Sequence, residues 1–351
     1  MNAWKKLIDW SNGEFNSLPW RMKRSLYHTL VSEIMLQQTT VSTVLNHFDK
    51  FIAIFPTLES LGNSSEEKVT LHWSGLGYYR RARNLLNGAK FIVDHHKGTI
   101  PLNFETLISI PGIGPYTASA IIAIGSNQKS LALDANLERV LSRVFNLKLP
   151  WGQKLKEELH KRFDQKKFPP IFYNRPREIH ESLMDLGRNF CLAKKVYCEK
   201  CPLSTICLAH KKNDFQINKG GKKESVVGLQ LVRFLITNKK NNEVLAYVKK
   251  KGQWLEGQIE VPTFILKSDN KNLTQYPYLK SDEKLKKLLK DAGLFTSHIT
   301  KYKIKNFVVS CDFEDFNQLA EIQKKDFHFY ALKYSANHFS TATLKSFKFL
   351  V

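Results

Sequence analysis

Apolar residues recur three and four positions apart through residues 7–207 of the chain. Residues at this spacing lie on one face of an α-helix, so the pattern predicts a series of amphipathic helices. One stripe is made by Leu30, Val31, Ile34 and Met35 and continued by Val41, Val44, Leu45 and Phe48, and a later one by Leu137, Val140, Leu141, Val144 and Phe145. Short breakers separate the helices at Gly75 and Gly77, at Pro101, at residues 111–115 and at residues 169–170. The pattern therefore predicts a mainly α domain over residues 1–210.

The pattern changes after residue 210. Residues 211–228 are polar, basic and glycine-containing, and they are interpreted as a linker because they have little apolar surface to bury. Beyond them apolar and polar residues alternate, which is typical of half-buried strands. The alternation is seen at Val232, Phe234 and Ile236, at Tyr302 and Ile304, and at Phe327 and Phe329, whereas Leu285, Leu288, Leu289 and Ala292 indicate a helix. The sequence therefore predicts a smaller α+β domain over residues 229–351.

The charge balance adds a candidate partner to this outline. Of the 351 residues, 54 are Lys or Arg and 32 are Asp or Glu, which gives a formal net charge of +22. Such an excess fits a polyanion such as nucleic acid, although a lysine-rich chain with a uniformly basic surface would give the same number. No apolar signal segment follows the first ten residues, and the longest apolar runs are far shorter than the roughly 20 residues of a membrane span. We therefore expect a cytoplasmic protein without a membrane segment.

Residues 110–120 read IPGIGPYTASA, in which two glycines stand between prolines at the start of an apolar helix. Such a tight turn places backbone N–H groups at a helix N-terminus, where they can bind a phosphate. An ordinary turn between two helices is the alternative. The basic composition and the flanking helices favour the interpretation that Gly112 and Gly114 contact a nucleic-acid backbone.

Two carboxylates stand in positions where chemistry is possible. Asp134 directly precedes the stripe that begins at Leu137, so its simplest role is to cap that helix. Glu33 is surrounded in the sequence by Val31, Ile34 and Met35, and we expect much of its helix to be buried. Burial raises the pKa of a carboxyl group, so Glu33 could hold a proton near neutral pH and act as a general acid.

Four of the five cysteines lie within 17 residues, at Cys191, Cys198, Cys201 and Cys207. A structural zinc site is the alternative, but such sites usually pair two short Cys-x-x-Cys segments across a longer gap. Here only one such segment is present and all four thiols belong to one loop, a spacing that favours an iron–sulfur cluster. Cys311 lies far away and is interpreted as an ordinary cysteine of the second domain.

Several segments occur in the order seen in MutY-type adenine DNA glycosylases, a family of the helix-hairpin-helix base-excision repair superfamily. They are LPWR at residues 18–21, SEIMLQQT at 32–39, GLGYYR at 75–80, the hairpin at 110–120, the segment around Asp134 and the four cysteines. The resemblance covers residues 4–209. It implies a six-helix barrel module over about 22–130, an iron–sulfur module from 1–21 and 131–210 holding a 4Fe–4S cluster, and a Nudix-like domain over 229–351.

The resemblance also implies roles for individual residues. The catalytic residues would be Glu33, which protonates the adenine, Asp134, which stabilises the oxocarbenium ion, and their assistants Tyr116 and Asn136. The substrate-binding residues would be Trp20, Arg21 and Glu181 around the flipped adenine, and Gln38 and Tyr78 beside the opposite 8-oxoguanine. Without that role, Trp20 and Tyr78 would be core aromatics and Arg21 a surface cation. The implied partner is double-stranded DNA with an adenine mispair, bound by a monomer associated with the nucleoid.

Alternatives and departures limit what the resemblance implies. An endonuclease III-type glycosylase with lyase activity would need a lysine two residues after Gly114, where this chain has Tyr116. A non-catalytic, cluster-containing DNA-binding protein would need neither Glu33 nor Asp134. The family usually has glycine at the position of Ala135, so an alanine there would strain the turn if that position needs a positive φ.

The second domain departs further from the family. It carries no Nudix box, so we expect no pyrophosphatase activity. The family's Phe-Ser-His recognition loop is not evident in the expected region, residues 305–310, which read KNFVVS, and the similar letters NHFS at residues 337–340 fall too late in the chain.

Overall fold

The computed structural model describes residues 2–215, 226–250, 252–279, 283–299, 301–319, 327–332 and 339–350. The chain divides into two compact units, Met1–Lys219 and Gly220–Val351. Most of the predicted linker, and residues 337 and 338 of the NHFS segment, lie outside the described residues.

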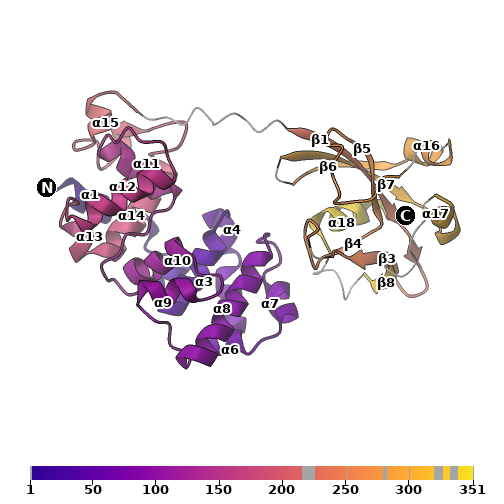
Figure 1. Ribbon diagram of the computed structural model, residues 1–351, viewed down its shortest axis with the longest axis horizontal. Helices are drawn as coiled ribbons and strands as arrows, with labels where there is room; N and C mark the ends of the chain where they lie inside the picture. The colour runs from indigo at the N-terminus through magenta and orange to yellow at the C-terminus, as the bar shows by residue number, and fades with distance from the viewer. Residues whose placement is uncertain are drawn as a thin grey trace. The chain divides into compact units, whose positions relative to one another are not determined.

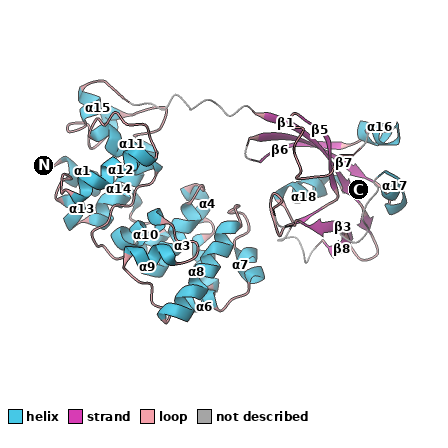
Figure 2. Cartoon of the chain, in the orientation of Figure 1, coloured by secondary structure: helices cyan, strands magenta, loops and turns pink. Residues whose placement is uncertain are grey.

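The described part of the first unit is helical (Figures 1 and 2), as predicted. Its elements are α1 (Ala3–Phe15), α2 (Pro19–Met22), α3 (Leu26–Leu36), α4 (Val41–Leu45), α5 (Phe48–Ile54), α6 (Leu58–Gly62), α7 (Glu66–His72), α8 (Arg80–His96), α9 (Phe104–Ser109), α10 (Pro115–Ala120), the π-helix η1 (Ile121–Gly125), α11 (Ala135–Val144), α12 (Gln153–Asp164), α13 (Ile171–Asn174), α14 (Pro176–Asn189), the 3-10 helix η2 (Cys198–Lys200) and α15 (Leu208–Lys211).

Two large apolar cores organise this unit. One packs α3 to α10 together, and its members run from Tyr27 to Ile122. The other combines α1 with α11 to α15, so the N-terminal helix packs against segments more than 120 residues away in the sequence. The predicted stripe of α11 is buried in this second core, where α14 packs against both α1 and α11.

The continuous stripe that was predicted beyond α3 is instead divided between two short helices. Val44 of α4 and Phe48 of α5 are buried, but Leu45 is 41% exposed. α4 ends at Leu45 and α5 begins at Phe48, so the helical spacing does not continue between them. The periodicity correctly indicated helix here, but it could not show the break.

The described residues of the second unit form an α+β domain with two four-stranded sheets (Figure 1). One sheet has the order β5-β1-β7-β6, and in the other β2, β3 and β4 are joined by β8, which pairs with β3. The strands are β1 (Val227–Leu235), β2 (Thr237–Asn238), β3 (Glu243–Val248), β4 (Ile259–Glu260), β5 (Thr263–Ser268), β6 (Gly293–Ile299), β7 (Tyr302–Ser310) and β8 (His328–Ala331). The helices are α16 (Glu283–Lys290), α17 (Phe313–Leu319), α18 (Thr341–Ser346) and the 3-10 helix η4 (Phe347–Phe349).

The central strand β1 differs from a half-buried strand. Leu231 faces one apolar cluster and Phe234 another, so β1 is covered on both faces and its later residues are all buried. Of the strands predicted from alternation, Val232 and Phe234 lie in β1, Tyr302 and Ile304 lie in β7, and Phe329 lies in β8. The predicted helix is α16, which ends two residues before Ala292.

The region expected to hold a recognition loop is a strand. Lys305 to Ser310 belong to β7, which is hydrogen-bonded to β1 on one side and β6 on the other. Ser340 of the later NHFS segment is completely buried and caps α18. Neither segment therefore forms an exposed loop among the described residues.

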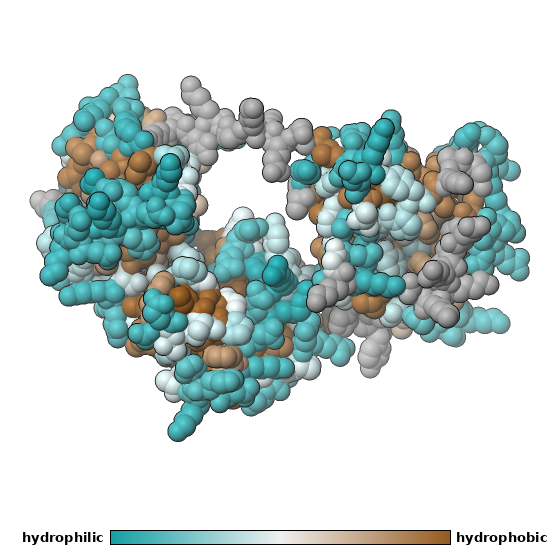
Figure 3. All heavy atoms as spheres, viewed as in Figure 1, coloured by the Kyte–Doolittle hydropathy of each residue, from teal (hydrophilic) through white to brown (hydrophobic). Residues whose placement is uncertain are grey.

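No helix in the described part of the chain has both the length and the apolar character to cross a bilayer. Figure 3 shows hydrophilic residues over most of the visible face of each unit, with smaller apolar areas between them.

Candidate functional site

A broad open cavity of about 1140 Å³ lies in the first unit, and ten of the eleven residues predicted for catalysis, base binding and backbone contact line it. These ten are Trp20, Arg21, Glu33, Gln38, Gly112, Gly114, Tyr116, Asp134, Asn136 and Glu181. They come from α2, from α3 and the turn after it, from the hairpin before α10 and α10 itself, from the N-terminus of α11 and from α14. The cavity therefore joins residues that are up to 161 positions apart in the sequence, and its volume exceeds the few hundred Å³ that a small ligand requires.

Glu33 lies on α3 with its side chain almost completely buried beside Tyr116. The Tyr116 hydroxyl donates a hydrogen bond to Glu33 Oε2 at 2.6 Å. Burial raises the pKa of Glu33 to about 7, and the Tyr116 hydrogen bond acts in the opposite direction. The negative charges of Asp134 and Glu181 raise this pKa further, and Arg21 lowers it. Glu33 can therefore carry a transferable proton near neutral pH, as its apolar neighbours in the sequence suggested.

Asp134 is the N-cap residue of α11, which confirms the simplest reading of the sequence. Its Oδ1 accepts a hydrogen bond from the Leu137 N–H at 2.7 Å, and its Oδ2 accepts one from Asn136 Nδ2 at 2.7 Å. Burial raises the pKa of Asp134, whereas these hydrogen bonds lower it because they favour the carboxylate. The same side chain lines the cavity, so capping does not prevent it from acting on a ligand.

A buried histidine fixes the segment before Asp134. His180 on α14 accepts a hydrogen bond at Nε2 from the Ala132 N–H at 3.1 Å, and its Nδ1 lies 2.6 Å from Pro176 O. Since a carbonyl oxygen can only accept, Nδ1 carries the proton and the ring is neutral. Burial lowers the pKa of His180 to about 4, which agrees with this tautomer. The strand-like segment before Asp134 is therefore attached to the helix that carries Glu181.

Ala135 does not strain the turn that it occupies. It is the first residue of α11 and has no positive φ. The backbone conformation at this position therefore does not require a glycine. Its side chain instead forms part of the cavity wall.

The two hairpin glycines differ in what they require. Gly112 has φ +83°, and a Cβ there would lie 2.7 Å from Asn84 O. Gly114 has φ −90°, caps α10, and has nothing within 4 Å of a Cβ position. The sequence did not single out Gly88 of α8, although a Cβ there would lie 2.7 Å from Pro111 O. Close packing of α8 on the hairpin therefore depends on Gly88 and Gly112.

Arg21 is not a surface cation, because only 7% of it is exposed. It binds Asp185 of α14 through Nη1 at 2.9 Å and Nη2 at 3.3 Å, and its Nε lies 3.5 Å from Glu181 Oε1. Arg24 binds both oxygens of Glu181, at 2.6 and 3.0 Å. The sequence analysis missed Arg24 and Asp185, although Glu181 and Asp185 are four residues apart and so share one face of α14.

Gln38 and Tyr78 both have left-handed backbones, with φ of 54° and 47°. Tyr78 is 63% exposed and lies outside the cavity lining, so it is not a core aromatic. Trp20 packs edge-to-face on Phe48 at 5.5 Å and also lines the cavity, which makes it both a core-packing and a cavity residue.

Arg81 joins the segments that carry Gln38 and Tyr78, and sequence reasoning did not identify it. Its guanidinium donates to Met35 O at 2.8 Å and to Leu76 O at 2.9 Å, and further hydrogen bonds go to Ile34 O, Gln37 O, Gly77 O and the Thr39 hydroxyl. The end of α3 and the loop before α8 are therefore held by one buried cation.

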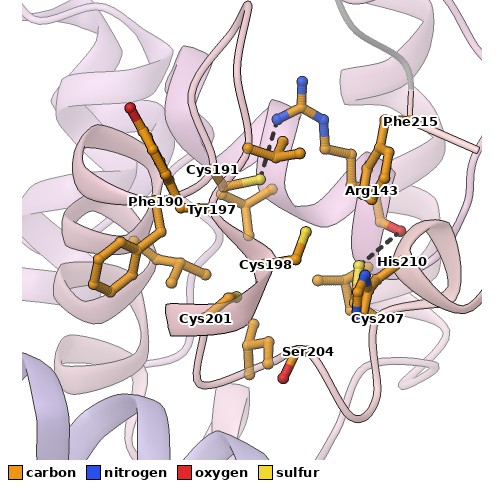
Figure 4. A pocket seen from close by; sticks show the side chains of 15 residues that line it. Arg143, Phe190, Cys191, Tyr197, Cys198, Cys201, Ser204, Cys207, His210 and Phe215 are labelled. Atoms are coloured by element: carbon orange, nitrogen blue, oxygen red, sulfur yellow. Dashed lines mark hydrogen bonds between the residues drawn. The ribbon is translucent and has the colours of Figure 1, made fainter. Parts of the chain in front are cut away.

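The four clustered cysteines line one small hollow between α11, α14 and the loop that follows α14 (Figure 4). Arg143 of α11 donates to Cys191 Sγ at 3.1 Å, and the Cys207 thiol contacts Arg143 O at 3.5 Å. Within the described ranges, no three His, Cys, Asp or Glu side chains converge closely enough to hold a single metal ion. The sulfurs surround a hollow instead, an arrangement that suits a group larger than one ion.

Comparison with known proteins gives a consistent set of relatives. Residues 31–165 match the family described as HhH-GPD superfamily base excision DNA repair protein. The chain is 35% identical over 289 residues to the adenine DNA glycosylase of Buchnera aphidicola subsp. Baizongia pistaciae, covering 82% of this chain and 80% of that protein. It is 35% identical over 215 residues to the human adenine DNA glycosylase, covering 59% of this chain and 39% of the human protein.

One solved structure adds a structural likeness. A thermostable thymine-DNA glycosylase superposes with a TM-score of 0.52 at 27% sequence identity, covering 60% of this chain and 95% of that one. The likeness agrees with a helical glycosylase fold in the first unit.

Proposed function

This chain belongs to the adenine DNA glycosylase family, within the HhH-GPD superfamily, and we propose that it removes adenine mispaired with 8-oxoguanine or guanine in duplex DNA. The observation that carries the proposal is the pairing of Glu33 with Asp134 on one cavity. Glu33 holds a proton near neutral pH, with a pKa of about 7, and Asp134 has hydrogen-bond donors on both of its oxygens. Mere binding of DNA would require neither group.

The division of labour between the two carboxyl groups follows from the bond that is broken. Cleavage of an N-glycosidic bond leaves its electron pair on the base and positive charge on the sugar. Glu33 gives its proton to the adenine ring, so that a neutral base departs, and Asp134 faces the cation at the sugar. Water then adds to the sugar carbon and loses a proton. Glycoside hydrolases use two carboxyl groups in the same way.

Tyr116 and Asn136 orient these two groups. The Tyr116 hydroxyl engages Glu33 Oε2, which leaves Oε1 to carry the transferable proton. The Asn136 amide holds Asp134 Oδ2 and in turn accepts from Arg139 at 2.7 Å. We propose that both residues act by fixing the directions in which the carboxyl oxygens point.

The enzyme is proposed to lack lyase activity. A β-lyase needs an amine that forms a Schiff base with the sugar, and a phenol cannot do so. Tyr116 occupies the relevant position, and no lysine is found among the described residues that line the cavity.

The four cysteines are proposed to hold a 4Fe–4S cluster. Thiols are the donors such clusters use, and here four of them line one hollow that is otherwise formed largely by apolar and aromatic side chains. When bound, the cluster would cross-link distant points of the loop between α14 and α15, beside α11, and this protein's own residues perform every step of the reaction. The Arg143 hydrogen bond to Cys191 Sγ would stabilise a thiolate ligand.

Recognition of the DNA is proposed to be shared between the two units. The hairpin around Gly112 and Gly114 offers backbone N–H groups to a phosphate, and the net charge of +22 favours a polyanion. Gln38 and Tyr78 would enter the duplex as adenine leaves the stack. The α+β unit is proposed to be a Nudix-like domain that contacts the 8-oxoguanine strand without pyrophosphatase activity.

A duplex cleavage assay tests the proposal. The purified protein should release adenine opposite 8-oxoguanine and opposite guanine, but it should cleave the strand only after alkali or heat is applied. Efficient trapping of a covalent complex by borohydride would favour a lyase instead. The Glu33→Gln variant should still bind the duplex but lose adenine release, by about 10²–10⁴-fold if Glu33 is the general acid. A variant as fast as the wild type would place the acid elsewhere.

A further inference from the structure

One arginine beside the cavity has a partner but no part in the reaction described above. Arg24 lies in the turn between α2 and α3, and its guanidinium binds Glu181 of α14 through two parallel hydrogen bonds of 2.6 and 3.0 Å. The side chain of Glu181 is 7% exposed and that of Arg24 is 28% exposed. Glu181 lines the cavity and Arg24 does not. Arg24 therefore binds the Glu181 carboxylate from outside the cavity, and Glu181 itself lines the cavity.

Neighbouring cations do not duplicate this contact. Arg21 donates hydrogen bonds to the carboxylate of Asp185 and to the main-chain oxygen of Glu181, and its Nε, although 3.5 Å from Glu181 Oε1, has no hydrogen-bond partner. Asp185 also binds Ser11 and lies 2.9 Å from Arg188. Arg177 interacts with Glu181 only through longer-range electrostatics. Arg24 is the group that neutralises Glu181 through direct hydrogen bonds.

We propose that Arg24 sets the base specificity of the cavity by holding Glu181 as an ionised carboxylate that only accepts hydrogen bonds. The inference rests on the proposed function, because it assumes that the base in the cavity is adenine. An ionised carboxylate has about four lone-pair sites, and Arg24 occupies two of them. The others remain for a donor in the cavity. Adenine offers such a donor in its exocyclic amino group, whereas a purine with oxygen at the same carbon offers only an acceptor.

Without Arg24, Glu181 would lose the two hydrogen bonds that favour its charge and would keep the 3.5 Å ion pair with Arg21. A buried carboxylate near other carboxyl groups tends to take up a proton, and Asp134 and Glu33 face the same cavity. A protonated carboxyl group donates as well as accepts, so it can bind an exocyclic carbonyl oxygen as readily as an amino group. Loss of Arg24 therefore relaxes specificity, whereas a merely structural role would slow all substrates alike.

Matched substrates and variants separate these outcomes. Single-turnover release is measured for adenine and for hypoxanthine, each opposite 8-oxoguanine in the same duplex, by wild type, Arg24→Met and Arg24→Lys. The control is Arg175→Met, since Arg175 pairs with Glu178 on the same helix but does not line the cavity. We expect the ratio of adenine to hypoxanthine rates to fall at least about tenfold in Arg24→Met, in line with one charged hydrogen bond. The ratio for Arg24→Lys should lie between those of the wild type and Arg24→Met, and Arg175→Met should keep the wild-type ratio.

A double variant completes the design. Glu181→Gln should lower the ratio because an amide also donates, and adding Arg24→Met to it should cause no further fall. Equal slowing of both substrates in Arg24→Met would overturn the inference, as would a further fall in the double variant. If Arg24→Met does not fold, the Arg24→Lys ratio decides alone. A wild-type protein that releases neither base would refute the proposed function itself, whereas adenine release with an unchanged ratio refutes only the role of Arg24.

Discussion

The proton on Glu33 can be moved along the pH scale in both directions by replacing its two neighbours. The Tyr116 hydroxyl donates to Glu33 Oε2 at 2.6 Å and thereby lowers the pKa of Glu33, which is about 7. The charge of Glu181 raises the same pKa. Because the general acid must be protonated, single-turnover release should be constant well below pH 7 and should fall about tenfold per pH unit well above it.

The part of the rate profile in which release falls with rising pH is called the alkaline limb. Tyr116→Phe should move the alkaline limb to higher pH, because it removes the Tyr116 hydrogen bond, which favours the carboxylate form of Glu33. A hydrogen bond to a buried charged group contributes about 1.5–3 kcal/mol, which corresponds to a displacement of about one to two pH units. Glu181→Gln should move the limb to lower pH, because it removes a negative charge that favours the proton on Glu33. The direction of each shift is independent of any loss in maximal rate.

The assay is single-turnover release of adenine from a pre-bound duplex, followed from pH 5.5 to 9 at constant ionic strength. Arg175→Met, which changes a charge on α14 away from the cavity, should leave the limb in place. Limbs that stay fixed in both variants, or that move in the same direction, would refute the assignment of the titrating group to Glu33.

Three further results are expected. Because the pKa of Glu33 in the folded state is raised above its ordinary value of 4.5 to about 7, its stabilising contribution is present below pH 4.5 and is lost as the pH rises to about 7. At pH 8 the free energy of unfolding of Glu33→Gln should therefore exceed that of the wild type by up to about 3 kcal/mol, and its denaturant midpoint should be higher. Equal midpoints would contradict this. Gly112→Ala should lower both thermal stability and duplex affinity, because a Cβ there would lie 2.7 Å from Asn84 O. Gly114→Ala should preserve folding, because nothing lies within 4 Å of its Cβ position. Equal melting temperatures of the two variants would contradict the packing described for the hairpin. The purified protein should be brown with about four iron and four sulfide per chain, and zinc without visible absorbance would exclude the proposed cluster.

Some of the site could be predicted because its signals are local. Glu33 lies among apolar residues on a helix, so its burial follows from the sequence around it. Asp134 stands directly before an apolar stripe, and a cap is a local interaction between residues three positions apart. The cysteines are close in the sequence and therefore close in space.

Other features depend on distant contacts and had no local signal. Arg24 and Glu181 are 157 positions apart, and they meet because the turn after α2 lies beside α14. The tautomer of His180 is set by two backbone groups from separate segments, Ala132 N–H and Pro176 O. In the second unit, alternation identified β1 and β7 but missed their neighbours β5 and β6. The side-chain pattern of a strand also does not determine which strands it pairs with.

Arg81 attaches the two segments through main-chain oxygens almost alone. Any amino acid supplies such an oxygen, so the anchor is insensitive to which side chains follow one another at residues 34–37 and 76–77. The side chains that are proposed to enter a duplex could therefore be exchanged over evolution while their backbone support stays the same. Variation in how these enzymes probe DNA would then be expected to accumulate at Gln38 and Tyr78, with Arg81 held constant beneath them.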